Sequence, residues 1–197
     1  HISYVSCHDD HCLRDRLVNT LGNDTSEETV LKLDKLAQTA VLTSQGVPFI
    51  FCGEELFRTK QGVGNSYKSP DAINAIPWTN KTKYHDLFQY YKELIAIRRA
   101  HPAFYLGAAE KVREHLEFLP AEGDNLVAFQ LKDIQGIDPA QRIIVVLNSN
   151  KTNRKIQIPD DTYQIVVKDG KADRNGLGTH VGPNLEVEAQ SAGFFLK

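Results

Sequence analysis

Six consecutive residues near the start of the sequence could each bind a metal ion. Residues 7–12 read Cys-His-Asp-Asp-His-Cys, and we call them the hexad. Zinc sites separate their ligands so that they converge, with two or more residues between cysteines or one helical turn between histidines. Contiguous side chains on an extended chain point alternately to opposite sides, so the whole hexad cannot reach one ion. Two or three of its residues could still join distant ligands, but the pattern is not specific for this, and we assign no metal ligand.

Composition argues against several classes of partner. Hydrophobic residues make up 41% of the 197-residue chain and charged residues 24%, which is ordinary for a soluble globular protein. The net charge of -2 leaves no basic surplus to attract nucleic acid phosphates or an anionic membrane. No apolar run is long enough to span a bilayer. We therefore expect no nucleic acid and no membrane partner, and we assign no cofactor.

Three general features of the sequence concern its origin. The chain contains no Met and begins at His1, which we interpret as a piece of a longer protein or a processed product. Its first residues lack the basic start and apolar core of a signal peptide. Three cysteines are an odd number, which favours a reducing compartment such as the cytoplasm over a disulfide framework.

The first half of the sequence alternates between predicted strands and helices. Residues 2–6 are β-branched and aromatic and predict a strand, with the hexad at its carboxyl end. A capping box of Thr25 and Glu28 then predicts a helix. Residues 47–52 are apolar without alternation, as in a strand covered on both faces. A long polar loop to residue 78 and an amphipathic helix over residues 85–100 follow. This alternation predicts parallel βα units, too few to cover a sheet by themselves.

The second half of the sequence is rich in short strand-like runs. Turn signals separate these runs, and their spacing predicts an antiparallel sandwich after a boundary near residue 104. The runs are VREHLEFL, LVAFQLKD, RIIVVLNSN, KIQIPD, TYQIVVKDG and LEVEAQSAGFFL.

Three segments, in order, resemble one family of carbohydrate-active enzymes. Residues 4–17 (YVSCHDDHCLRDRL) resemble the segment of type I pullulanases that carries their last catalytic aspartate. Residues 46–62 (GVPFIFCGEELFRTKQG) resemble the eighth barrel strand and its loop, and residues 64–78 (GNSYKSPDAINAIPW) resemble the loop that follows. The resemblance is to the α-amylase superfamily, glycoside hydrolase family 13. It implies that residues 1–104 form the last two βα units of a (β/α)8 TIM barrel and residues 105–197 a C-terminal β-sandwich.

The resemblance also implies an activity. Pullulanases hydrolyse α-1,6 linkages in pullulan and in branched starch or glycogen fragments, and they retain the anomeric configuration. Three carboxylates act in such enzymes, and only the third, which holds sugar hydroxyls and favours the distorted ring, has a counterpart here, Asp9. His8 would bind the same sugar. The implied partners are a branched α-glucan and the remainder of the parent barrel, and we expect the isolated chain to be inactive.

Four further residues are implied to bind substrate. Asp10 stands where pullulanases usually have Asn, which adds negative charge beside Asp9. Asn65 and Tyr67 correspond to loop residues that contact a sugar one subsite further from the cleaved bond, while Asp71 and Asn74 would support that loop or contact the same sugar. Structural explanations for Asn65, Tyr67 and Asp71 are also open, since Asn and Asp form turns in any protein.

Other residues are expected to be structural, and other functions stay open. We expect Trp78 to anchor the loop in the core, Glu54 and Glu55 to belong to a loop or helix start, and Cys7 and Cys52 to be buried. The alternatives are an isoamylase-like or amylase-like enzyme, or a non-catalytic carbohydrate-binding module. The aromatic residues of the second half fit core packing better than a row of sugar-binding platforms.

Overall fold

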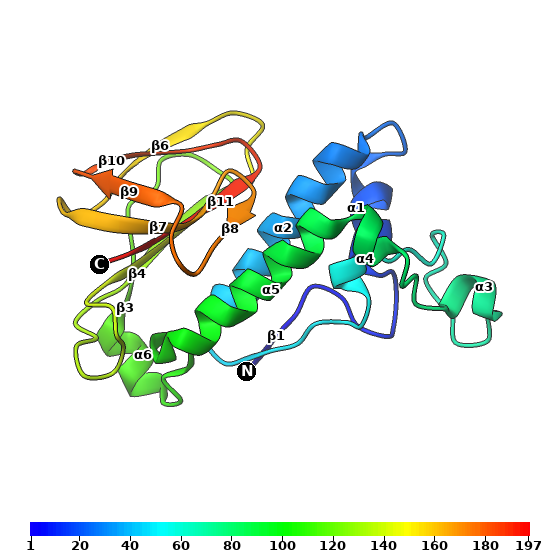
Figure 1. The fold of residues 1–197 in the computed structure, drawn as a ribbon, viewed down its shortest axis with the longest axis horizontal. Helices are drawn as coiled ribbons and strands as arrows, with labels where there is room; N and C mark the ends of the chain where they lie inside the picture. Colours follow the sequence, from blue (N-terminus) through cyan, green and yellow to red (C-terminus); the bar gives the residue numbers. More distant parts are fainter.

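An antiparallel sheet of seven strands dominates the computed structural model, which describes residues 1–197 (Figure 1). Neighbouring strands follow the order β3-β4-β5-β11-β7-β8, and β9 also pairs with β7. The strands are β3 (Leu116–Phe118), β4 (Leu126–Leu131), β5 (Ile143–Asn148), β7 (Thr162–Lys168), β8 (Lys171–Ala172), β9 (Gly178–Val181) and β11 (Ser191–Leu196). The predicted antiparallel β structure of the second half is thus confirmed.

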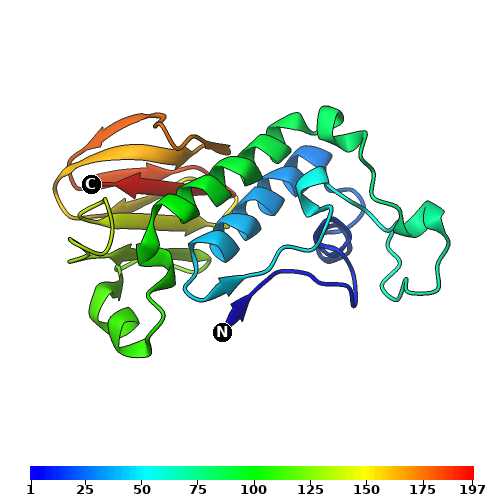
Figure 2. The same ribbon diagram turned by 60° about the horizontal axis from the view of Figure 1, so that its bottom comes forward.

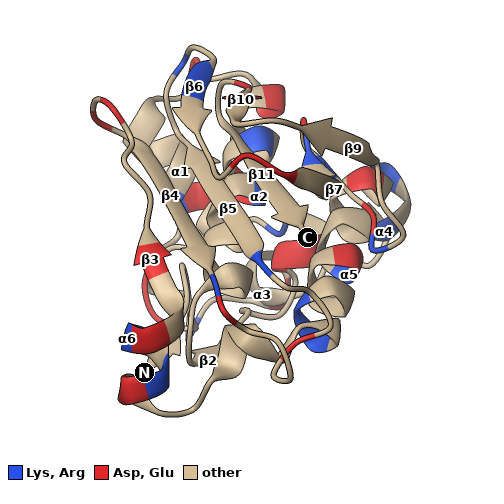
Figure 3. Cartoon of the chain, turned by 90° about the vertical axis from the view of Figure 1, so that its left-hand side faces the viewer, with Lys and Arg blue, Asp and Glu red and all other residues tan.

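A small second sheet covers one face of the large one. Strands β6 (Arg154–Gln157) and β10 (Asn184–Val187) pair antiparallel. Their inward side chains share one apolar cluster with the large sheet, and the cluster includes Ile156, Leu185, Ile144, Tyr163 and Phe195. In Figure 3 strands β4 and β5 are almost free of charged side chains, which is how strands covered on both faces read.

Two long helices cover the other face of the large sheet. Helices α2 (Glu27–Thr43) and α5 (His85–Ala100) lie side by side and cross the sheet (Figures 1 and 2). Leu36 of α2 and Leu94 of α5 belong to the same buried cluster as Phe194 of the sheet. The helical and β-rich halves therefore share a core, while the division at residue 104 stays a prediction.

The predicted strands of the first half are present but short. Strand β1 (Ile2–Ser3) pairs in parallel with β2 (Val47–Pro48), rather than over residues 2–6 and 47–52. Each strand has one neighbour, so nothing on its other edge extends the hydrogen-bonded ladder. Two paired strands are not a barrel, and the barrel part of the predicted fold class is not observed within this chain.

The helices differ from the prediction at three places. Ser26, and not Thr25, caps α2, because its Oγ accepts from the backbone N of Thr29 at 3.2 Å. Helix α1 (Leu13–Leu21) was not predicted. Helix α6 (Ala109–His115) includes residues 112–115, which were predicted as strand. The helix forms because its sequence contains the strong helix formers Glu110, Lys111 and Arg113.

The remaining helical turns are short. They are η1 (Glu54–Leu56), α3 (Asp71–Asn74), α4 (Asn80–Lys83) and η2 (Pro102–Tyr105). None of the helices combines the length and the apolarity that a bilayer crossing requires.

Candidate functional site

His8 and Asp9 of the hexad are open to solvent, in the segment that follows β1. The side chains of His8 and Asp9 are 82% and 80% exposed, and His8 Nε2 lies 3.4 Å from Asp9 Oδ2. Neither side chain forms a hydrogen bond with the rest of the chain, so the carboxylate of Asp9 has only His8 beside it and keeps acceptor sites for a ligand. An unengaged carboxylate with an adjacent imidazole can accept and donate hydrogen bonds to one small polar ligand.

Asp10 turns the chain after Asp9. Its φ of 60° lies in the left-handed region, which Asn and Asp enter more readily than other residues with a Cβ. Its Oδ2 lies 4.0 Å from Arg16 Nη2, at an exposed position. Asp10 therefore meets the backbone requirement of this turn as an asparagine does, and its predicted contact with substrate stays a prediction.

The last two residues of the hexad, His11 and Cys12, face another loop. His11 Nε2 lies 3.0 Å from the carbonyl oxygen of Gly62, to which it donates. The buried thiol of Cys12 lies 3.3 Å from the carbonyl oxygen of Arg58 and 3.2 Å from Asp15 Oδ2. Burial raises the pKa of the Cys12 thiol from 9.0 to about 11, so the thiol stays protonated and donates. The hexad thus splits into an exposed pair and an inward-facing pair, and its side chains do not converge on one point.

Asp15 of α1 strengthens this contact between two segments far apart in sequence. Its buried carboxylate accepts from the backbone N of Lys60 at 2.7 Å and from the hydroxyl of Thr59. Because α1 follows the hexad directly, these bonds fix the hexad against residues 58–62. We call residues 53–78 the long loop. The structure thus brings together the first part of this loop and the hexad, which the sequence singled out separately.

The predicted substrate-binding residues of the long loop lie further along it. Asn65, Tyr67 and Asp71 are all exposed, and Asp71 begins α3, which projects beyond the two long helices (Figures 1 and 2). Tyr67 is 75% exposed, and Lys68 Nζ lies 5.2 Å from its ring centroid. No hydrogen bond or ion pair joins these residues to His8 or Asp9, so their grouping with that pair stays a prediction.

Three residues that were expected to be buried are not. Trp78 is 68% exposed, which overturns its expected role as a core anchor. Cys52 is exposed and Cys7 is half-buried, while Cys12 is the buried cysteine. All three lie on or beside the parallel strands and the long loop, where this chain supplies no second layer to cover them.

A buried polar network beneath the hexad was not foreseen. Glu54 accepts from the hydroxyl of Ser6 and from Gln38 Nε2 at 2.6 Å. Nearby, Asp34 accepts from the hydroxyl of Tyr91 at 2.7 Å. The signal was present, because Asp34 and Gln38 lie four and eight residues after buried Val30 and therefore share its helix face. Glu54 does begin a helical turn, as expected, but it also bonds that turn to Ser6, the residue directly before the hexad.

Burial of Glu54 should make the protein's stability depend on pH. Loss of hydration raises the pKa of the Glu54 carboxyl from 4.5 to about 7. The folded protein therefore holds a proton that the unfolded chain releases from about pH 4.5 upward. Its contribution is fully present below pH 4.5 and is lost as the pH rises through about 7.

We expect Glu54→Gln to reduce this dependence, because a glutamine amide is neutral and can bond to both Ser6 and Gln38. The midpoint of thermal unfolding between pH 5 and pH 8 measures the effect. The variant should be the more stable protein at pH 8, whereas the exposed control Glu122→Gln should follow the wild type. If the unfolding midpoints of the wild type and of Glu54→Gln change by the same amount between pH 5 and pH 8, the assignment is contradicted.

Known proteins resemble this chain in both sequence and fold. The family model described as "Pullulanase, all-beta domain" matches residues 112–171. The pullulanase of Bacillus subtilis (strain 168) is 37% identical over 160 residues, covering 81% of this chain and 22% of that protein. The solved pullulanase from Bacillus acidopullulyticus superposes with a TM-score of 0.93 at 36% identity, over 100% of this chain and 24% of that one.

A third relative was solved with sugars bound. The pullulanase from Paenibacillus barengoltzii, in complex with maltohexaose and alpha-cyclodextrin, superposes with a TM-score of 0.85 at 35% identity. That match covers 99% of this chain and 29% of the solved one. The chain thus spans between a fifth and a third of the length of these relatives.

Proposed function

We propose that this chain, which belongs to the pullulanase family, is one part of an enzyme that hydrolyses α-1,6 linkages in branched α-glucans. Residues 1–104 would contribute the last two βα units of its (β/α)8 barrel, and residues 105–197 its C-terminal β domain. The observation that carries the proposal is an exposed His8–Asp9 pair, free of hydrogen bonds to the rest of the chain, in the segment that follows the parallel strand β1, in a chain that superposes over its whole length on a pullulanase.

The apolar side chains left exposed on and beside the two parallel strands support the barrel assignment. Ile2, Tyr4, Val47 and Phe49 are exposed, and the rings of Tyr4 and Phe49 meet edge to face with centroids 6.1 Å apart. Parallel sheets are normally covered on both faces, and their edges are paired or protected. The missing cover is what the other strands of a closed barrel would supply, with their side chains filling its interior.

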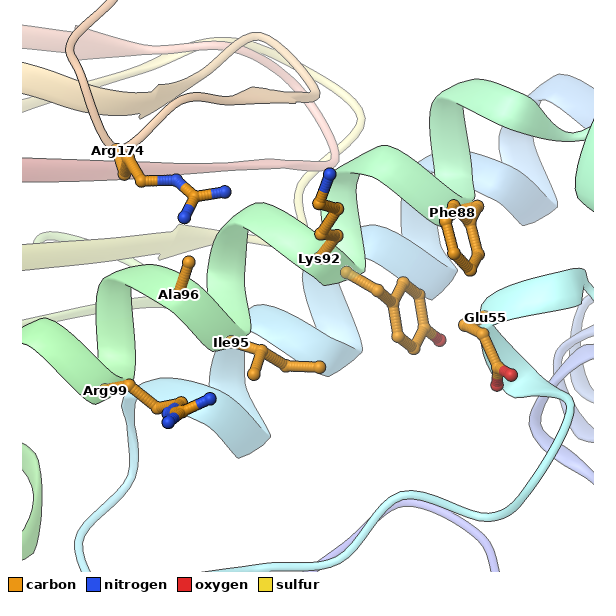
Figure 4. A pocket seen from close by; sticks show the side chains of 8 residues that line it. Glu55, Phe88, Lys92, Ile95, Ala96, Arg99 and Arg174 are labelled. Carbon is orange, nitrogen blue, oxygen red and sulfur yellow. The ribbon is translucent and has the colours of Figure 1, made fainter.

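The outer surface of α5 supports the same assignment. Figure 4 shows a groove along this helix between Glu55, from the turn after β2, and Arg174, from the β-rich half. The α5 side chains that line it are Phe88, Tyr91, Lys92, Ile95, Ala96 and Arg99. This mixture of apolar and cationic groups fits a neighbouring amphipathic helix, and each outer helix of a barrel has such a neighbour.

In the proposed reaction Asp9 holds the sugar ring at the cleaved bond. Its carboxylate would accept from two sugar hydroxyls, and these charge-assisted hydrogen bonds strengthen as positive charge develops on the ring. His8 would donate to a hydroxyl of the same sugar. Asp10, Asn65, Tyr67 and Asp71 would contact substrate nearby, and the exposed ring of Tyr67 offers a flat apolar face for a sugar.

The isolated 197-residue chain should not hydrolyse pullulan. A retaining glycosidase needs a nucleophile and an acid/base in addition to the group that Asp9 represents, and both would lie on the absent strands. Reducing-sugar release measures the activity. Release of sugar by the purified chain above a no-enzyme blank would contradict the prediction.

The full-length parent protein tests the proposal itself. It should release reducing sugar from pullulan at a much higher rate than from amylose, which has no α-1,6 linkages. A parent that hydrolyses amylose and leaves pullulan intact would instead be an amylase. A parent that binds maltooligosaccharides without hydrolysing either polymer would be a binding protein.

A further inference from the structure

We propose that two buried cations, Lys60 and Arg58, are positioning residues that hold the substrate-contacting part of the long loop in its binding conformation. The inference rests on the proposed function, because the residues they position, Asn65 and Tyr67, are the proposed sugar contacts. Neither cation was singled out from the sequence.

Lys60 is a buried ammonium group without a carboxylate partner. It is 5% exposed, and no Asp or Glu oxygen lies within 4.0 Å of its Nζ. Its Nζ donates to the hydroxyl of Ser66 at 2.6 Å and lies 5.2 Å from the ring centroid of Phe51. Burying a charge without a counter-ion costs free energy. A contribution to stability therefore does not explain why Lys60 is buried. Its hydrogen bond to Ser66, which fixes the position of that residue, does.

Arg58 is linked to the same segment through Asn74. Its guanidinium donates to the carbonyl oxygen of Cys52 at 2.9 Å and to that of Asn74. The amide of Asn74 in turn donates to the carbonyl oxygens of Ser66 at 2.7 Å and Ser69 at 2.9 Å. Ser66 is thus held by its side chain through Lys60 and by its backbone through Asn74.

Ser66, which these hydrogen bonds fix, lies between two residues whose side chains are exposed. Ser66 is 2% exposed, whereas its neighbours Asn65 and Tyr67 are exposed and their side chains form no hydrogen bond within the chain. The direction of these two side chains is therefore set by the backbone at Ser66. A preorganised loop binds its ligand without the entropic cost of ordering, so loosening Ser66 should weaken binding more than it slows the chemical step.

The test compares Lys60→Met and Ser66→Ala in the full-length parent. Met keeps the length and apolar stem of Lys60 and removes the donor, while Ser66→Ala removes the acceptor with little change of volume. Each variant should raise KM for pullulan about tenfold and lower kcat less than about threefold, because the catalytic carboxylates are unaffected. The double variant should match either single one, since both remove the same bond. The exposed control Lys111→Met should leave KM and kcat unchanged.

Two results would overturn the inference. One is a KM within about twofold of wild type in Ser66→Ala, and the other is a double variant whose effect is the product of the single effects. Titration of the same proteins with maltotriose separates this inference from the proposed function. If the wild-type parent binds maltotriose but hydrolyses nothing, the proposed function fails, and an unchanged affinity in both variants would then overturn the positioning role as well.

Discussion

Replacing Asp9 by Asn in the full-length parent should lower kcat for pullulan by about a thousandfold or more. The amide keeps the shape of the carboxylate but loses the charge that stabilises a positively charged sugar ring. The protein should stay folded, because the Asp9 side chain is 80% exposed and its carboxylate has no ion-pair partner other than His8. Reducing-sugar release under saturating substrate measures the change.

Asp24→Asn is the matched control for this substitution. Asp24 is exposed and forms no ion pair or side-chain hydrogen bond, so its variant should keep wild-type activity. If Asp9→Asn is as active as this control, Asp9 is not the transition-state carboxylate. The hexad would then have to be explained again, with partial metal ligation as the first alternative.

Phe194→Ala should produce the largest loss of stability among the substitutions considered. Phe194 of β11 is 1% exposed and belongs to the core that joins the sheet to α2 and α5. Its ring meets that of Phe104 edge to face, with centroids 5.4 Å apart. Removing a buried phenylalanine costs about 3–5 kcal/mol, from lost burial and from the cavity left behind. Hydrogen exchange of the β5 and β11 backbone amides measures this loss where it occurs.

Phe118→Ala controls for the loss of a phenyl ring as such. Phe118 of β3 is 69% exposed, so its removal should change the same protection by less than about 1 kcal/mol. Equal effects of the two substitutions would show that the shared core does not hold the β-rich half against the helices. The two halves would then be independent units rather than parts of one core.

The sequence identified best those elements that local patterns specify. Helix α5 has the predicted bounds, residues 85–100, because a stripe of apolar residues fixes its buried face and Pro102 ends it. Strands β4 and β5 follow apolar runs that fill two adjacent cores. Helix α1 was missed because a buried carboxylate, Asp15, holds it in place, and a charged residue does not contribute to an apolar pattern.

The site was only partly predictable, because contacts with distant residues decide which side chains of the hexad are exposed and which face inward. Nothing local distinguishes His8 from His11, yet His8 is exposed while His11 bonds to Gly62, fifty-one residues away. The buried status of Lys60 likewise depends on Ser66 and Phe51, and lysines in loops are normally exposed. The shortness of β1 and β2 was likewise not readable from the apolar runs, because each of the two strands pairs only with the other.

The product that the full-length parent releases from pullulan tests the central claim most directly. Pullulan is built of maltotriose units joined by α-1,6 linkages, so hydrolysis at these linkages should yield maltotriose as the main final product on size separation. That result would support a debranching enzyme to which this chain contributes Asp9. Trisaccharides that still contain an α-1,6 linkage would mean cleavage at α-1,4 bonds, and no product at all would mean that the chain does not serve pullulan hydrolysis; either outcome would contradict the account.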